Sequence, residues 1–145
     1  MPSVANAVFD DDDRLLLLRH LHSGLWGMPG GAMEPGETPA SAATRELSEE
    51  TGLACEPYAL IGVTGGPDHI VRYPNGDRTA YVTTIFAVRW DGTEVQPDGT
   101  EVDEALWVSG DDVGKIETDV LTRENIQLIF DWYAATPGDQ RAWFR

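Results

Sequence analysis

The chain begins with an alternating stretch of apolar residues and continues with an unbroken apolar run. The alternating stretch covers residues 4–9, and the run extends from Leu15 to Leu18, with four aspartates, Asp10 to Asp13, between them. This pattern predicts two strands joined by a solvated hairpin turn. A calcium-binding loop is disfavoured, because its sixth and twelfth positions would be Leu15 and Leu21 where Gly and Glu are expected.

The following segment, residues 22–37, is dense in glycine and proline, so we expect it to form a shaped loop. A helix is predicted directly after it, over residues 39–51. Thr38 is a suitable N-cap, Pro39 fits the first helical position, and Gly52 stands where a left-handed residue commonly ends a helix.

The second half of the chain predicts further strands. Residues 58–63 are typical of a strand, and residues 105–108 of another short one. Residues 69–73 and 78–90 are expected to face each other across the turn Pro74-Asn75-Gly76-Asp77, because Asn-Gly is a strong hairpin signal.

A second helix is predicted near the end of the chain. A possible cap, Thr122, precedes apolar residues at helical spacing: Ile126, Ile129, Phe130 and Tyr133. The dipeptide after residue 136, Pro-Gly, would stop the helix. The order of strands, loop, helix, strands and helix predicts an α/β fold, with a mixed sheet and helices packed against it.

Length, composition and charge narrow the possible functions. The 145 residues are about the length of one domain, so residues 1–145 are expected to form a single one. With 41% hydrophobic and 24% charged residues, the composition is that of a soluble globular protein. No stretch approaches the roughly 20 apolar residues of a membrane helix. Ten basic and 25 acidic residues give a net charge of −15, which argues against general nucleic-acid binding.

The single cysteine, Cys55, excludes an internal disulfide framework and a metal site made only of cysteines. Residues 1–5 lack the basic start and the apolar run of a secretory signal. The sequence therefore predicts a cytoplasmic protein without attachment to a membrane.

The predicted helix carries a cluster of acidic side chains. Glu46, Glu49 and Glu50 stand at positions i, i+3 and i+4, so they project from one side of the helix. The acidic side is expected to border the core, because an apolar stripe suited to packing on the sheet adjoins it. That stripe consists of Ala40, Ala43 and Leu47.

Clustered negative charges destabilise a helix unless a cation compensates them. A hard divalent ion, Mg²⁺ or Mn²⁺, fits carboxylate ligands best, and the absence of histidine from the cluster disfavours zinc. Arg45 is placed to pair with Glu49 at i, i+4 and to hold it in orientation. The alternative is an ordinary solvated acidic face.

The loop and the helix together contain a spaced motif. From Gly31 to Leu53 the residues read Gly-x5-Glu-x7-Arg-Glu-Leu-x-Glu-Glu-x-Gly-Leu. This motif resembles the signature of the Nudix hydrolase family at every defining position, and the lead-in from Trp26 to Gly31 is similar to that of the family. The resemblance implies an α/β/α sandwich around a mixed sheet.

The resemblance also implies an activity and a set of site residues. Nudix enzymes hydrolyse a nucleoside diphosphate linked to another group, by attack of a metal-activated water on phosphorus. The implied catalytic residues are Glu49, Glu46 and Arg45. The general base is left open between Glu49, Glu46 and a glutamate of a later loop, for which Glu101 is the first candidate and Glu104 the second. The implied metal site for Mg²⁺ or Mn²⁺ consists of the backbone carbonyl of Gly31 with Glu46, Glu49, Glu50 and, from a later loop, Glu101.

The substrate is expected to be a small nucleotide derivative. Aromatic rings and guanidinium groups bind nucleobases, and the candidates on the loop and the hairpin are Trp26, Arg72, Tyr73, Arg78 and Tyr81. A nucleoside triphosphate and an ADP-ribose-like substrate both remain open. The family resemblance also leaves open a homodimer, and a catalytically silent module that binds or senses nucleotides.

Overall fold

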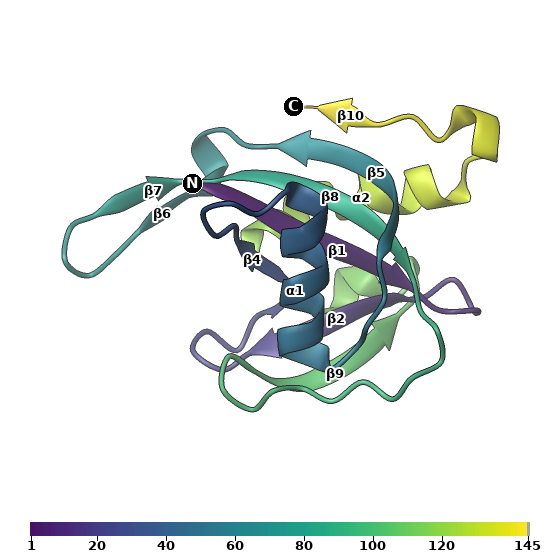
Figure 1. Ribbon diagram of the computed structural model, residues 1–145, viewed down its shortest axis with the longest axis horizontal. Coiled ribbons are helices and arrows are strands. Elements are labelled where there is room, and N and C mark those ends of the chain that lie inside the picture. Colours follow the sequence, from purple (N-terminus) through teal and green to yellow (C-terminus); the bar gives the residue numbers. More distant parts are fainter. Residues whose placement is uncertain (145) are drawn as a thin grey trace.

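The computed structural model describes residues 1–144, which form ten strands and two α-helices (Figure 1). The helices are α1 (Pro39–Thr51) and α2 (Val120–Ala134), with short 3-10 turns at Pro67–His69, Val113–Lys115 and Pro137–Asp139. The strands are β1 (Pro2–Phe9), β2 (Leu15–His20), β3 (Trp26–Gly27), β4 (Gly30–Ala32), β5 (Pro57–Thr64), β6 (Ile70–Arg72), β7 (Arg78–Ala80), β8 (Val82–Arg89), β9 (Val102–Val108) and β10 (Trp143–Phe144).

Eight strands form one mixed sheet, with the order β10-β5-β8-β1-β2-β3. In addition, β4 pairs with the first half of β1, and β9 pairs with β2. β1 runs parallel to β8 and β5 parallel to β10, whereas the remaining pairs are antiparallel. The predicted α/β fold with a mixed sheet is confirmed. β6 and β7 form a separate two-stranded hairpin that projects from the body (Figure 1).

The two helices cover opposite faces of the sheet, α1 in front and α2 behind in Figure 1. Successive residues of a strand point to opposite faces, and both faces are buried here. Val8 and Leu16 belong to the core cluster that contains Leu47 of α1, whereas Leu15 belongs to the cluster that contains Ile129 of α2. Each of residues 15–18 lies in one of these two cores, which explains why the apolar run is unbroken.

Helix α1 begins and ends where the sequence predicts. The Thr38 side chain accepts a hydrogen bond from the backbone N–H of Ser41 at 3.1 Å, and Pro39 occupies the first helical position. Gly52 adopts φ 75°, and its N–H donates to the Ser48 carbonyl at 2.9 Å. The predicted apolar stripe is wrong at Ala40, which is exposed, while Ala42 is fully buried in its place.

Two other predictions of secondary structure are wrong. Helix α2 is capped by Asp119, whose Oδ1 accepts the N–H of Thr122 at 2.8 Å, so Thr122 is buried inside the first turn. The predicted strand at residues 78–90 is interrupted at Tyr81, whose N–H donates to the His69 carbonyl. The break separates β7, which pairs only with β6, from β8, which lies between β1 and β5 in the main sheet.

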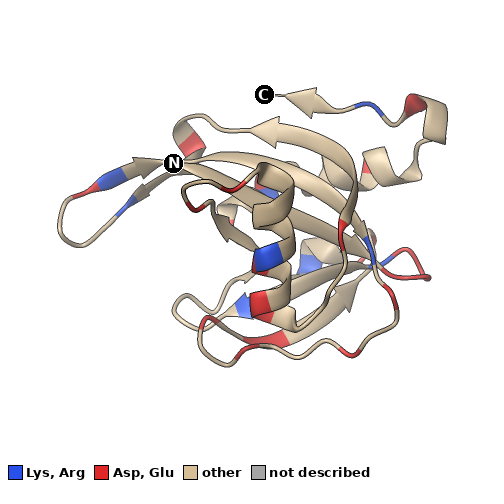
Figure 2. Ribbon diagram, in the orientation of Figure 1, with Lys and Arg blue, Asp and Glu red and all other residues tan. Residues whose placement is uncertain are grey.

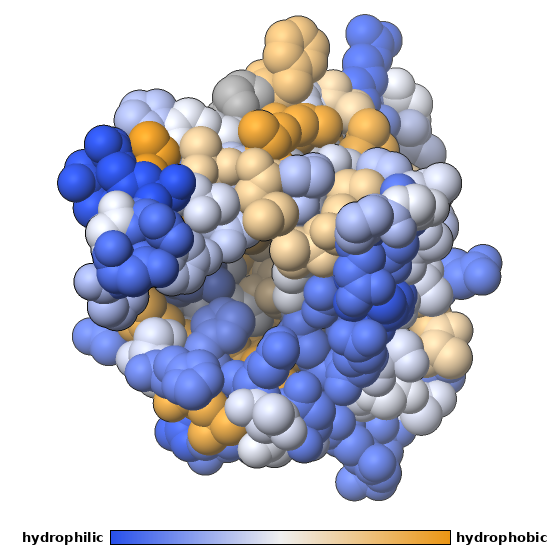
Figure 3. All heavy atoms as spheres, turned by 60° about the vertical axis from the view of Figure 1, so that its left-hand side comes forward, coloured by the Kyte–Doolittle hydropathy of each residue, from blue (hydrophilic) through white to orange (hydrophobic). Residues whose placement is uncertain are grey.

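Some large apolar side chains remain on the surface: Phe144 is 88% exposed, and Met1 and Val82 are each 53% exposed. In Figure 3, apolar residues gather along the upper part of one face, and hydrophilic residues cover most of its lower half. Among residues 1–144, no helix is long and apolar enough to cross a membrane.

Candidate active site

The candidate site forms where strand β4 meets helix α1. Gly30 and Gly31 pair with Ala5 and Val4 of β1, which fixes the loop at the edge of the sheet under the helix. The Glu46 carboxylate lies directly against Gly31, since a Cβ atom at that position would be 2.5 Å from Glu46 Oε1. Gly31 therefore leaves the space that the carboxylate occupies.

Glu46 and Glu50 form a buried pair at this point. Their residues are only 8% and 3% exposed, and Glu50 Oε1 accepts the N–H of Gly30 at 3.3 Å. Burial and the neighbouring Glu46 carboxyl raise the pKa of Glu50 to about 9, and burial also raises the pKa of Glu46. Each of the two carboxyl groups contributes to the pKa shift of the other, so the two lie close together. The prediction that the acidic side borders the core is confirmed for these two residues.

Arg45 holds the surrounding carboxylates in place. Its guanidinium donates to both carboxylate oxygens of Glu37, at 2.7 and 2.9 Å, and to the Ala32 carbonyl at 3.1 Å. It also donates to Glu46 at 3.1 Å and to Glu49 at 3.2 Å, the i, i+4 contact expected from the sequence. These bonds raise the pKa of Arg45 and lower that of Glu37, so the pair of Arg45 and Glu37 is charged at neutral pH.

The other two candidate ligands do not join the buried pair. The Glu49 side chain is 58% exposed and turned toward Arg45. Glu101 is exposed and lies near enough to Glu50 to contribute to its raised pKa. Its loop is held at the end of α1 by a hydrogen bond from Asp98 N–H to the Glu50 carbonyl at 3.1 Å. Figure 2 shows acidic positions on α1 and along this loop between β8 and β9.

Whether the site suits a metal ion depends on its donor atoms. Within residues 1–144, no set of three or more His, Cys, Asp or Glu side chains is gathered closely enough to hold a metal as it stands. Two buried carboxylates in contact, however, are stable only with a proton or a cation between them. Oxygen atoms of this kind are the donors that Mg²⁺ and Mn²⁺ prefer. The residues present therefore fit a hard divalent cation, and Glu46 and Glu50 would be its main ligands.

The predicted substrate residues lie in two other places. Trp26 is half-buried and packs against the core on the α2 side, and its backbone bonds to Glu117 and Asp119. The other four lie on or directly after the β6–β7 hairpin. There the Tyr73 and Tyr81 hydroxyls are 2.8 Å apart, and Arg72 and Arg78 are paired in register and exposed.

Sequence reasoning missed three polar residues near these elements. Asn6 is fully buried in β1, and its Nδ2 donates to the Pro29 carbonyl at 3.3 Å and to the Ala43 carbonyl at 3.0 Å. A polar residue inside an apolar strand was a signal that could have identified it. His20 and Asp119 lie 3.1 Å apart against Gly27, and their separation of 99 residues gave no local signal.

Comparison with known proteins shows which proteins the chain resembles. A family model described as the NUDIX domain matches residues 1–129. The chain is 34% identical over 113 residues to a MutT-like protein of Streptomyces ambofaciens, a match that covers 78% of this chain and 66% of that one. It is 31% identical over 122 residues to an ADP-ribose pyrophosphatase of Methanocaldococcus jannaschii, a match that covers 81% of this chain and 68% of that one. The chain thus spans about two thirds of the length of these curated relatives.

Solved structures share the fold. An ADP-ribose pyrophosphatase from Streptococcus suis 89-1591 superimposes with a TM-score of 0.77 at 22% identity, over 99% of this chain and 98% of that one. A MutT protein from Methanosarcina mazei Go1 gives a TM-score of 0.76 at 22% identity, over 94% of this chain and 96% of that one. Together with the match of the family model and the complete motif at residues 31–53, these findings establish that the chain belongs to the Nudix hydrolase family.

Proposed function

We propose that the chain is a pyrophosphohydrolase that cleaves a nucleoside diphosphate linked to another group, by attack of water on phosphorus. The observation that carries this proposal is the buried pair Glu46 and Glu50 against Gly30 and Gly31. Such a pair attracts a cation, and a protein with a net charge of −15 can hold a diphosphate only if cations stand between the two.

Mg²⁺ or Mn²⁺ is the proposed cofactor. Glu46 and Glu50 would hold it, with the carbonyl of Gly31, Glu49 and Glu101 as further ligands. When bound, such an ion lowers the pKa of water and stabilises charge on the phosphoryl oxygens.

Glu49 is the residue that we propose as general base. Only its Oε2 is bound to Arg45, at 3.2 Å, and the side chain is more than half exposed, so the second oxygen is open to accept a proton from water. Arg45 restricts the orientation of both Glu49 and Glu46 from one guanidinium. Glu101 is the alternative base, because its loop is fixed beside Glu50.

Two substrate classes are proposed. Relatives of the chain include proteins described as ADP-ribose pyrophosphatase and as a putative 8-oxo-dGTP diphosphatase. The exposed pair Arg72 and Arg78 would attract phosphate groups, and the rings of Tyr73, Tyr81 and Trp26 would offer surfaces for a base. Both an ADP-ribose-like compound and a nucleoside triphosphate suit such a surface.

The test is an assay of purified protein with Mg²⁺ or Mn²⁺ against nucleoside triphosphates, 8-oxo-dGTP, ADP-ribose, dinucleoside polyphosphates and nucleotide sugars. We expect one class to be cleaved, and we expect Glu49→Gln and Glu50→Gln to lower kcat at least about 100-fold, because each removes a carboxylate from the site. Glu56→Gln is the matched control, since Glu56 is exposed and lies outside the site, and it should keep full activity. Full activity of Glu49→Gln and Glu50→Gln would contradict the proposal.

A silent module that binds nucleotides without turnover is the alternative. The complete set of Arg45, Glu46, Glu49 and Glu50 weighs against it, since binding alone has less need of a paired-carboxylate activator. Calorimetry would favour the silent module if a nucleotide bound with micromolar affinity and no product formed with either metal.

A further inference from the structure

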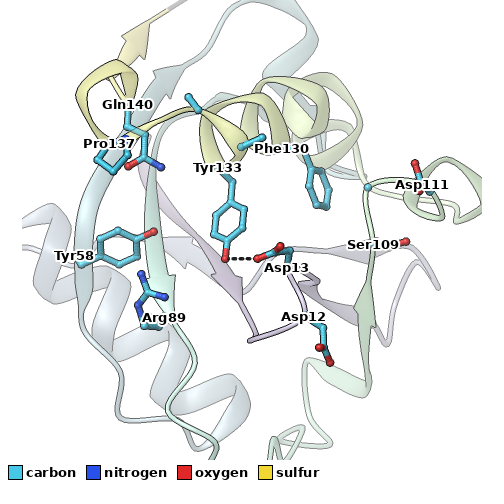
Figure 4. A pocket seen from close by; sticks show the side chains of 13 residues that line it. Asp12, Asp13, Tyr58, Arg89, Ser109, Asp111, Phe130, Tyr133, Pro137 and Gln140 are labelled. Atoms are coloured by element: carbon cyan, nitrogen blue, oxygen red, sulfur yellow. Dashed lines mark hydrogen bonds between the residues drawn. The ribbon is translucent and has the colours of Figure 1, made fainter.

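A cavity of about 670 Å³ lies at the far end of strand β1 (Figure 4). Its volume is within the range of small-molecule sites, roughly 300–1,000 Å³. Gly30 pairs with Ala5, whereas the cavity adjoins the turn after Phe9, about 13 Å further along at about 3.3 Å per residue. It is walled by α2, on the face of the sheet opposite to α1, so it is separate from the candidate active site.

One side of the cavity presents hydrogen-bond donors. Arg89, at the end of β8, lies over the Tyr58 ring, 5.3 Å from its centroid. Among residues 1–144, no carboxylate lies within ion-pair distance of Arg89, whereas Arg14, Arg19 and Arg45 are all paired. Burial raises the pKa of Tyr58, so its hydroxyl stays protonated and able to donate. A guanidinium and a phenol that point into one cavity are a site for a carboxylate.

The other side of the cavity presents acceptors and an apolar ring. The Tyr133 hydroxyl donates to Asp13 at 2.9 Å, and in Figure 4 it stands between the Tyr58 and Arg89 side and the side with Phe130 and Asp111. Asp13 adopts φ 60°, a backbone conformation that favours glycine. Its carboxylate nevertheless lines this cavity and accepts the hydrogen bond of Tyr133. Carboxylates here attract an ammonium group.

The balance of charge selects the kind of ligand. The lining contains one arginine, Arg89, and three aspartates, Asp12, Asp13 and Asp111, of which Asp12 is paired with Arg14 at 3.4 Å. A nucleotide or another polyphosphate would be repelled by the aspartates. A molecule with one carboxylate and one ammonium group would be attracted at both ends.

We propose that this cavity binds a small zwitterion, whose carboxylate pairs with Arg89 and Tyr58 and whose ammonium group faces Asp13 and Asp111. Because Tyr133 stands between the two ends, several bonds must separate the two charges, as they do in a dipeptide. The Phe130 ring, on the side of the ammonium group, offers an apolar surface to the ligand.

The test is calorimetric titration of the wild-type protein with glycyl-phenylalanine, N-acetyl-glycyl-phenylalanine, glycyl-phenylalanine amide and AMP. We expect the free dipeptide to bind, each blocked derivative to bind at least about tenfold more weakly, and AMP not to compete. The proposal is overturned if glycyl-phenylalanine does not bind at millimolar concentration, or if the blocked derivatives bind as well as the free dipeptide. This comparison uses only the wild-type protein, so it does not depend on whether a variant folds.

Variants test which residues bind each end of the dipeptide. Arg89→Gln should bind the dipeptide and its amide equally, while it keeps the preference for a free amine. Asp13→Asn keeps an oxygen for Tyr133 and should lose the preference for the free amine instead. Arg123→Gln makes the same change of charge on α2, at a side chain that is 60% exposed, and should bind like the wild type. Equal losses in Arg89→Gln and Arg123→Gln would refute the assignment of Arg89.

Discussion

At the scale of single residues, Arg45 decides the shape of the candidate site. It contacts Glu37, Ala32, Glu46 and Glu49 at once, which a guanidinium can do because its five N–H groups have a fixed planar arrangement. The sequence predicted its contact with Glu49, but not that both oxygens of Glu37 bind more closely. Glu37 is therefore the main anchor of Arg45, and Glu49 the group that the anchored arginine orients.

We expect Arg45→Lys to lower kcat for the best substrate about 10- to 100-fold, because an ammonium group cannot make this set of contacts. The measurement is steady-state kinetics with Mg²⁺, beside far-UV circular dichroism to show that the fold persists. Activity within twofold of the wild type would show that the positive charge alone suffices.

A second residue, Asn6, joins the loop of Gly30 and Gly31 to helix α1 through Pro29 and Ala43. Its Oδ1 has no partner among the described residues. Asn6→Ala would lose two hydrogen bonds and leave a cavity at a fully buried position, so the free energy of unfolding should fall by about 1–3 kcal/mol. We also expect kcat to fall, because the loop and the helix lose their link.

Urea unfolding and kinetics on the same preparations test this prediction. Ser3→Ala is the matched control, because Ser3 is also buried in β1 and bonds to Thr83 instead of to the helix. Equal loss of activity in both variants would contradict a specific role for Asn6.

At the scale of elements, helix α1 depends on local signals at its ends. Thr38 and Ser41 form a capping box, in which each side chain binds the other residue's backbone N–H. These contacts involve residues only three apart, which is why the start of the helix could be predicted from the sequence.

Thr38→Ala should lower the free energy of unfolding by about 1 kcal/mol, because the N–H of Ser41 loses its acceptor. Denaturant unfolding measures the change. Thr44→Ala, at an exposed hydroxyl that bonds to the Ala40 carbonyl inside the same helix, is the control. It should change stability by no more than about 0.5 kcal/mol, since alanine is the better helix former. A larger loss at Thr44 than at Thr38 would be inconsistent with a capping role.

At the scale of the whole molecule, the Tyr133 hydroxyl ties helix α2 to the turn between β1 and β2, 120 residues away. Burial and the bond to Asp13 raise the pKa of Tyr133 to about 12, against the effect of Arg89 nearby. A raised pKa in the folded state stabilises the fold below the ordinary tyrosine pKa, near 10. This stabilisation is lost as the pH rises from about 10 through about 12.

We therefore expect the midpoint of urea unfolding to fall between pH 10 and 12 more steeply in the wild type than in Tyr133→Phe. Absorbance of the phenolate should show one late-titrating tyrosine that this variant lacks. Identical pH profiles in both proteins would rule out the link.

The sequence by itself determined the features that depend on neighbouring residues. The motif from Gly31 to Leu53 identified the family, and Thr38, Pro39 and Gly52 set both ends of α1, because caps and turns act over a few residues. The hairpin turns at residues 10–13 and 74–77 follow from the same local chemistry. The mixed sheet followed from the order of the elements.

Only the tertiary structure decided which distant groups meet. It split the predicted strand at Tyr81, gave the cap of α2 to Asp119, and turned Glu49 toward Arg45 while it buried Glu46 and Glu50 together. It also brought Tyr58, Arg89 and Tyr133 around one cavity. The physical reason is that burial, and the hydrogen bonds and pKa shifts that burial imposes, depend on which elements pack together, and no short stretch of sequence contains that information.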